Sequence, residues 1–213
     1  MNILEVDEEK FKVTNSTYYL KLNKENVELE CNNNSTIIID NYIKNLIINL
    51  KDNVKINISI LNNKKNINSN LKIIANNNTN FYLYSGFLVN EESNLKIINE
   101  ITGDNNKSKI KLRGISSNEH LNIYVDLKVK KGTIDNELTE DIKGITDGGK
   151  ISVSPVMEID THEVIANHFV TISSVDKDQL FYLENKGISY TEAKKLILKG
   201  FINNENTEVI NNE

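Results

Sequence analysis

Few side chains in this sequence could bind a metal ion or act as a nucleophile. Histidine occurs at positions 120, 162 and 168, and the single cysteine is Cys31. A neutral imidazole binds metals near pH 7, but these residues form no CxxC or HExxH motif. The chain also lacks a GxxxxGK[S/T] nucleotide loop and a GxSxG serine elbow. We therefore expect the chain to be no enzyme and expect nucleotide binding to belong to a partner.

Composition narrows the kind of protein. The 213 residues carry a formal charge of −5 and give a pI near 5.4, which argues against a nucleic-acid surface because phosphate binding needs a concentrated basic face. No apolar stretch approaches the roughly 20 residues that span a bilayer, and the acidic beginning of the chain is no signal peptide. One cysteine fits a reducing compartment. We predict a cytoplasmic protein with neither nucleic acid nor membrane as a partner.

Short β-branched runs separated by polar turns fill the chain up to about residue 131. The runs are 36–40, 45–50, 54–61, 70–76, 80–86, 94–101, 108–116 and 120–129. Within each run apolar and polar residues alternate, which is the strand pattern. Asparagine is about one residue in six and tolerates the positive φ of tight turns. Both a β-sandwich and a parallel β-helix fit this spacing.

The last third of the chain changes character. We read residues 132–155 as further, less regular strands with an exposed turn at Asp147–Gly149. Two short helices follow, each with a capping box: Asp176 with Gln179, and Ser189 with Glu192. Gly187 is the expected stop between them. The apolar stripe of the second helix is Ala193, Leu196, Ile197, Gly200 and Phe201.

The same region carries a spaced set of residues without a gap. The set is Pro155, Glu158, Ile159, His168, Thr171, the run Leu180-Phe181-Tyr182-Leu183, Gly187, Ile188, Ala193 and Phe201. It resembles the end of the core domain of the SufB/SufD family, whose members are scaffold subunits of iron–sulfur cluster assembly. The close resemblance covers about a quarter of the chain.

The resemblance implies a fold and a set of partners. The fold is a right-handed parallel β-helix over residues 1–172, then a two-helix hairpin over 173–203, with a fraying tail at 204–213. One face of the hairpin would cap the last rung of the β-helix, and the other would bind a SufC-like ABC-type ATPase. The chain itself would be a short, SufD-like, non-catalytic scaffold that pairs with itself or with a SufB-like paralogue. Tyr182, Leu198 and Ile202 lie off the main apolar stripes, and we assign them to partner contacts.

The resemblance also implies where a cluster would form. His168 matches the family's motif histidine and would supply an imidazole, at a subunit interface, to a transient iron–sulfur cluster; His162 is the weaker metal-ligand candidate. The SufB-type cysteine, sought around 139–141, is missing, and Phe169 stands where SufB has glutamate. Cys31 is expected to be a buried thiol, and His120 a surface residue. Two alternatives remain open: a β-helix carbohydrate-active enzyme and a structural β-helix protein.

Overall fold

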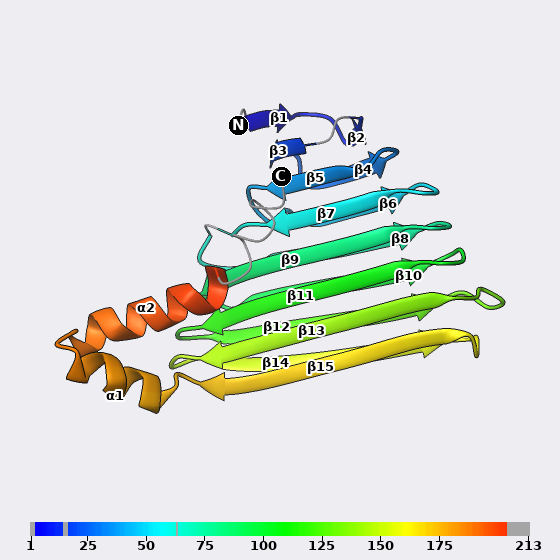
Figure 1. Cartoon of the computed structure of the whole chain (residues 1–213). Coiled ribbons are helices and arrows are strands. Elements are labelled where there is room, and N and C mark those ends of the chain that lie inside the picture. The colour runs from blue at the N-terminus through cyan, green and yellow to red at the C-terminus, as the bar shows by residue number, and fades with distance from the viewer. Residues whose placement is uncertain (1–2, 15–16, 63, 204–213) are drawn as a thin grey trace.

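Successive strands of the chain alternate between two parallel sheets, as Figure 1 shows. The computed structural model describes residues 3–14, 17–62 and 64–203. The eight-stranded sheet contains β1 (Ile3–Val6), β3 (Thr17–Leu22), β5 (Ser35–Ile39), β7 (Lys55–Ile60), β9 (Asn80–Val89), β11 (Lys107–Ser116), β13 (Asn136–Thr146) and β15 (Val164–Ser174), in that spatial order. The seven-stranded sheet contains β2 (Lys10–Val13), β4 (Asn26–Cys31), β6 (Asn45–Leu50), β8 (Asn68–Ala75), β10 (Ser93–Ile101), β12 (His120–Val129) and β14 (Lys150–Ile159).

The result is a parallel β-helix, in which each rung adds one strand to each sheet. Its rungs lengthen along the chain. Near the beginning Ile3 lies beside Tyr19 of the next rung, whereas further along Lys107 lies beside Glu137, after a much longer stretch of chain. Strand length grows with the rung, from four residues in β1 to eleven in β15. The structure is therefore narrow at its amino-terminal end and wide at its carboxyl-terminal end (Figure 1).

The alternation of each strand explains the core. In β12, Leu121, Ile123 and Val125 point inward and are 2% exposed or less, while their polar neighbours face outward. Equivalent positions stack from rung to rung because the strands pair in register. One continuous cluster of mainly aliphatic side chains thus fills the space between the two sheets.

Asparagine performs two tasks at the turns. Asn53, Asn78 and Asn105 have positive φ values of 55° to 63°, which asparagine tolerates better than most residues. Asn106 is fully buried and joins three rungs: its Oδ1 accepts from the backbone N–H and hydroxyl of Thr79 at 2.9 and 2.7 Å, and its Nδ2 donates to Asn136 Oδ1 at 3.0 Å. The asparagines, which the sequence predicts as turn residues, therefore also stabilise the stack of rungs.

Two helices follow β15: α1 (Lys177–Asn185) and α2 (Tyr190–Asn203). Asp176 caps α1 by accepting from the N–H groups of Asp178 and Gln179. Ser189 accepts from the N–H of Glu192 and donates to its carboxylate, which is the second predicted capping box. Gly187 has a φ of +85° between the helices. Within the described part of the chain, no helix is long and apolar enough to cross a membrane.

The parallel β-helix and the helix pair confirm the fold expected from the resemblance, and the sandwich alternative is wrong. Two details of the prediction are also wrong. Residues 132–155 are regular, since β13 and β14 span eleven and ten residues. The helix pair does not cap the last rung: α2 packs mainly on β9 and β11, against the outer face of the eight-stranded sheet (Figure 1). The predicted tail, 204–213, lies outside the described residues.

Candidate functional site at the open end of the beta-helix

The last rung leaves two sheet edges uncovered. Among the described strands, β14 and β15 stand at the ends of their sheets and each has a strand neighbour on one side only. Four large apolar side chains of β15 are exposed: Ile165 (63%), Phe169 (57%), Val170 (40%) and Ile172 (42%). An exposed edge of eleven residues with apolar side chains is a surface on which another strand can pair.

His168 lies at the centre of this edge strand and faces the interior. Its register partner on β13 is Glu140, and its ring Nδ1 is 2.7 Å from Glu140 Oε2. The Glu140 side chain is only 1% exposed, while that of His168 is 19% exposed. The contact is short but not aligned as a hydrogen bond, and among the described residues neither group has another hydrogen-bond partner.

The surroundings disfavour the charged form of both groups. Burial, with a smaller effect from the negative charge of Asp126, raises the pKa of Glu140 to about 8. Burial also lowers the pKa of His168 below its ordinary value. A neutral imidazole is the form that binds a metal ion.

The other predicted ligands lie elsewhere. His162 is exposed in the turn before β15. The stretch of strand from Val164 to His168 already spans about 13 Å at the usual strand rise, so the two histidines do not share one ion. His120 contacts Ser152 at 2.7 Å on the surface of the seven-stranded sheet. Across the ranges that the structure describes, no three His, Cys, Asp or Glu side chains form a metal-binding group.

Cys31 is fully buried in the main core, as expected from the sequence. Burial raises the pKa of its thiol to about 12. A protonated, enclosed thiol is a poor nucleophile and a poor ligand.

The sequence analysis assigns no role to Glu140, because it considers segment 139–141 only as a place where a cysteine is sought. The missing signal is the length of the rung, which places Glu140 directly before His168 in the stack.

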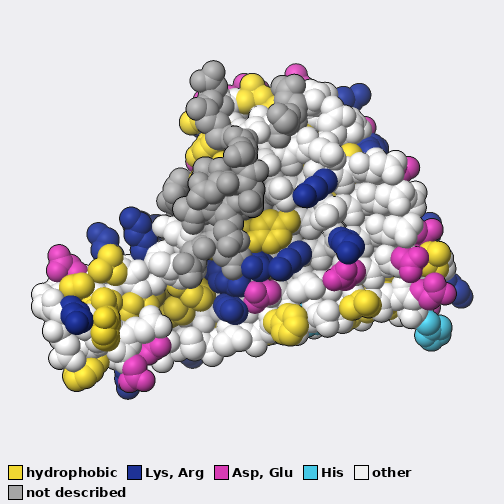
Figure 2. Space-filling view, viewed as in Figure 1, with side chains coloured by type: hydrophobic (Ala, Val, Ile, Leu, Met, Phe, Trp, Pro, Cys, Tyr) yellow, Lys and Arg dark blue, Asp and Glu magenta, His cyan; other side chains and the backbone are white. Residues whose placement is uncertain are grey.

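The helix pair presents a second apolar surface. Phe181, Tyr182, Tyr190 and Leu196 are 52% to 68% exposed, and Figure 2 shows hydrophobic side chains gathered on the helices. Leu196, predicted for the buried stripe, is thus exposed. Of the three residues assigned to a partner, Tyr182 lies on this surface. Leu198 and Ile202 instead pack within the chain, in a second core with Ile115 and Ile145.

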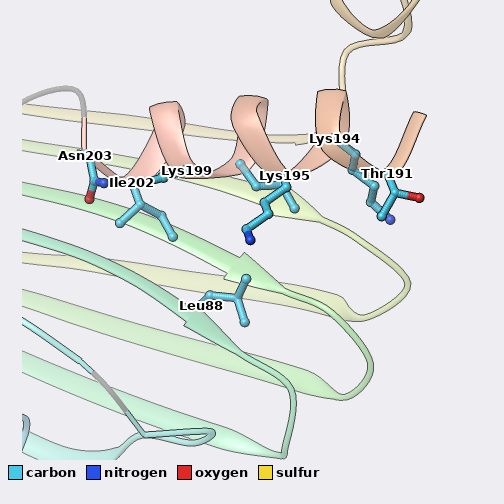
Figure 3. Close-up of a pocket in the computed structure, with 8 residues that line it drawn as sticks. Leu88, Thr191, Lys194, Lys195, Lys199, Ile202 and Asn203 are labelled. Atoms are coloured by element: carbon cyan, nitrogen blue, oxygen red, sulfur yellow. The ribbon is translucent and has the colours of Figure 1, made fainter. Parts of the chain in front are cut away.

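A groove of about 380 Å³ runs between α2 and the end of β9. Its apolar floor includes Leu88 and Ile202, and Lys195 and Lys199 line it from the helix, as Figure 3 shows. Lys194 is already paired with Asp147 at 2.6 Å. The groove joins an apolar floor to a positively charged wall.

Comparison with known proteins agrees with this architecture. Residues 14–201 match the family described as the SufBD core domain of SUF system FeS cluster assembly. The chain belongs to the SufBD family. It is 31% identical over 144 residues to an iron–sulfur cluster assembly SufBD family protein, ycf24, of Galdieria sulphuraria, and the match covers 64% of each chain.

Other relatives match over shorter stretches. The iron–sulfur cluster assembly protein SufD of Bacillus subtilis is 39% identical over 49 residues, which are 23% of this chain and 11% of that protein. A chloroplastic SufBD family protein of Arabidopsis thaliana, ABCI8, is 29% identical over 102 residues, 46% of this chain and 18% of that protein. The chain thus spans less than two thirds of the length of these SufBD relatives.

Proposed function

We propose that this SufBD family protein is a non-catalytic scaffold of iron–sulfur cluster assembly. In this function it pairs through β15 with a second β-helix subunit and docks a SufC-like ABC-type ATPase on its helix pair. The observation that carries the proposal is the uncovered edge of the last rung, with His168 at its centre. The carbohydrate-enzyme and structural-protein alternatives have no comparable observation in their favour.

The β15 edge supports pairing with another β-helix. The backbone N–H and C=O groups on the open side of β15 can form a ladder with another extended strand. Burial of Ile165 and Phe169 would add about 1.5–3 kcal/mol for each side chain. The occupant is either a second copy of this chain or a SufB-like paralogue.

The helix pair supports ATPase docking because its exposed side is apolar. Phe181 and Tyr182 protrude from α1, which packs on α2. Exposed aromatic side chains of this kind are typical anchors in protein interfaces. The fixed position of α2 on β9 and β11 would couple a movement of the ATPase to the wide end of the β-helix.

The cluster would be cargo at the interface between the two subunits. Iron accepts imidazole ligands, and His168 is the candidate from this chain. Since no group of three ligands occurs in the described part of the chain, sulfide and the partner subunit would have to supply the rest. We propose a reducing compartment such as the cytoplasm, which suits the lone buried thiol.

Co-expression tests the two contacts separately. The chain is purified with a SufC-like ATPase, and its oligomeric state is measured by light scattering. Ile165→Lys with Phe169→Lys should abolish pairing and keep ATPase binding, whereas Phe181→Ser with Tyr182→Ser should do the reverse. Ile3→Lys, which changes an exposed isoleucine on β1 at the opposite end of the sheet from β15, is the matched control. A wild-type chain that binds no ATPase would refute the docking function.

A further inference from the structure

Three neighbouring side chains on the outer face of the eight-stranded sheet are buried although they point away from the core. Ile38, Ser59 and Tyr84 form a row across β5, β7 and β9. The residue before each of them belongs to the main core, so strand alternation turns the three side chains outward. They are nevertheless only 8%, 4% and 1% exposed. Phe169, in the same row on β15, is 57% exposed.

The described elements account for the burial of Tyr84 alone. α2 packs on this face mainly over β9 and β11, and the carbonyl group of its Ile202 accepts from the Tyr84 hydroxyl. Among the described elements, no helix packs to that extent on the outer face of β5 or β7. The Ser59 hydroxyl has no hydrogen-bond partner within the described ranges. The burial of Ile38 and Ser59 therefore requires a further cover.

The chain leaves α2 directly over this row. An added Cβ at Gly86 of β9 would be 2.5 Å from the carbonyl oxygen of Ile202. α2 ends at the next residue, Asn203, and the ten residues 204–213 follow with the sequence NENTEVINNE. Ten residues can span about 33 Å, whereas β5 lies two strand spacings, about 10 Å, from β9. The end of the chain is therefore long enough to cross the row.

The composition of this segment matches the surface. It contains three glutamates, no Lys or Arg, and one apolar pair, Val209 and Ile210. Lys109, Lys111 and Arg113 occupy successive outward positions of β11, beside β9. Figure 2 shows Lys and Arg side chains gathered beside the end of α2. An acidic segment with an apolar pair thus complements an apolar row that is bordered by cations.

We propose that residues 204–213 form a strap that lies across the outer faces of β9, β7 and β5. The apolar pair of the strap covers Ile38 and Ser59, and its first glutamate, Glu205, faces the cations of β11. Because the strap is tethered to α2, its effective concentration is high and weak contacts are sufficient. The strap fastens the end of the helix pair to the narrow half of the β-helix. This inference does not depend on the proposed function.

Cysteine labelling tests the cover in the full chain. Ser59→Cys places a thiol of similar size in the row and breaks no hydrogen bond among the described residues. Lys55→Cys, at an exposed position on the same face of β7, is the accessible reference. A maleimide should label Ser59→Cys about 10–100-fold more slowly than Lys55→Cys, because the strap must open first. The buried Cys31 should stay unlabelled in both, which confirms that the chain is folded.

Substitutions in the last ten residues then identify the cover. Val209→Asp with Ile210→Asp should raise the labelling rate of Ser59→Cys to nearly that of the reference. Asn211→Asp with Asn212→Asp adds the same charge without removing apolar surface and should leave labelling slow. High salt should speed labelling, because it screens the attraction between the strap and β11.

Three results would overturn the strap. The first is fast labelling of Ser59→Cys in the otherwise unchanged chain. The second is slow labelling that persists after both aspartates replace the apolar pair, since another segment then covers the row. The third is protection that disappears on dilution, which assigns the cover to a second copy.

Carbodiimide cross-linking of the unsubstituted chain gives a measurement that does not depend on the cysteine variants. A zero-length link should join Glu205 to Lys109 or Lys111, as identified by mass spectrometry of the digested monomer. Links to Lys195 or Lys199 instead would place the segment in the groove beside α2 and refute the strap. The absence of any link from Glu205 to β11 would equally count against it.

Discussion

Gly86 of β9 decides whether α2 can lie on the β-helix. A Cβ atom at this position would be 2.5 Å from the carbonyl oxygen of Ile202 and 2.6 Å from its Cγ2. Both distances are shorter than van der Waals contact, and the first atom belongs to the backbone. The hydroxyl group of Tyr84 also donates to the same carbonyl. Gly86→Val should therefore push the end of α2 away while improving the strand, since valine favours β structure.

The magnitude follows from what α2 contributes at this point. Burial of Leu198 is worth about 1.5–3 kcal/mol, and the Tyr84 hydrogen bond about 1 kcal/mol. Overpacking costs roughly 1–3 kcal/mol, which is comparable with the whole attachment. We expect the free energy that holds α2 closed to fall by about 2 kcal/mol. That change corresponds to a roughly 30-fold larger equilibrium constant for opening.

Hydrogen exchange measured by mass spectrometry reports the opening of α2 directly. Amides of α2 should exchange roughly 30-fold faster in Gly86→Val, while amides of β10 and β12 keep their wild-type rates. Gly200→Ala is the matched control, because nothing lies within 4 Å of its added Cβ; it should slow α2 exchange through better helix propensity. Unchanged α2 exchange in Gly86→Val would show that the helix does not depend on close approach to β9.

Three further predictions concern other parts of the chain. Asn106→Ala should lower the free energy of unfolding by about 2–4 kcal/mol in urea titrations, because it removes several buried hydrogen bonds at once; a change below about 0.5 kcal/mol would contradict the bridging role. Asp176→Ala should cost about 1 kcal/mol and speed exchange in α1 only, since it removes the cap. Cys31 should resist thiol reagents at pH 8 until the chain unfolds. Its pKa in the folded chain, about 12, exceeds the ordinary value of 9. The protonated thiol therefore contributes fully to stability below pH 9, and this contribution is lost as the pH rises toward 12.

Short-range sequence patterns are sufficient to predict the strands and the helix caps. The alternation in residues 54–61 and 120–129 corresponds to β7 and β12, and both capping boxes occur as predicted. These features depend on neighbours within a few residues. The choice between a sandwich and a β-helix depends on which strands pair, and pairing between positions as distant in sequence as Lys107 and Glu137 leaves no short-range pattern. That choice comes from the family resemblance.

The position of α2 and the importance of Glu140 require coordinates. Leu196 and Leu198 are both leucines on one helix, and their burial is decided by the flank on which the helix lies. Glu140 becomes informative only when the length of its own rung is known, because that length brings it to His168. Segment 132–155 looks irregular because of its acids and glycines, yet backbone pairing with β11 and β12 keeps its strands straight.

The gradual widening of the stack restricts how copies can associate. A four-residue strand at the narrow end offers too few backbone groups to match an eleven-residue strand at the wide end. Head-to-tail joining generates open filaments. It would leave most backbone N–H and C=O groups of the longer strand without hydrogen-bond partners. Like ends, in contrast, are equal in length, and two wide ends offer the longer ladder. The taper thus directs self-association, where it occurs, toward a closed pair and away from fibre growth.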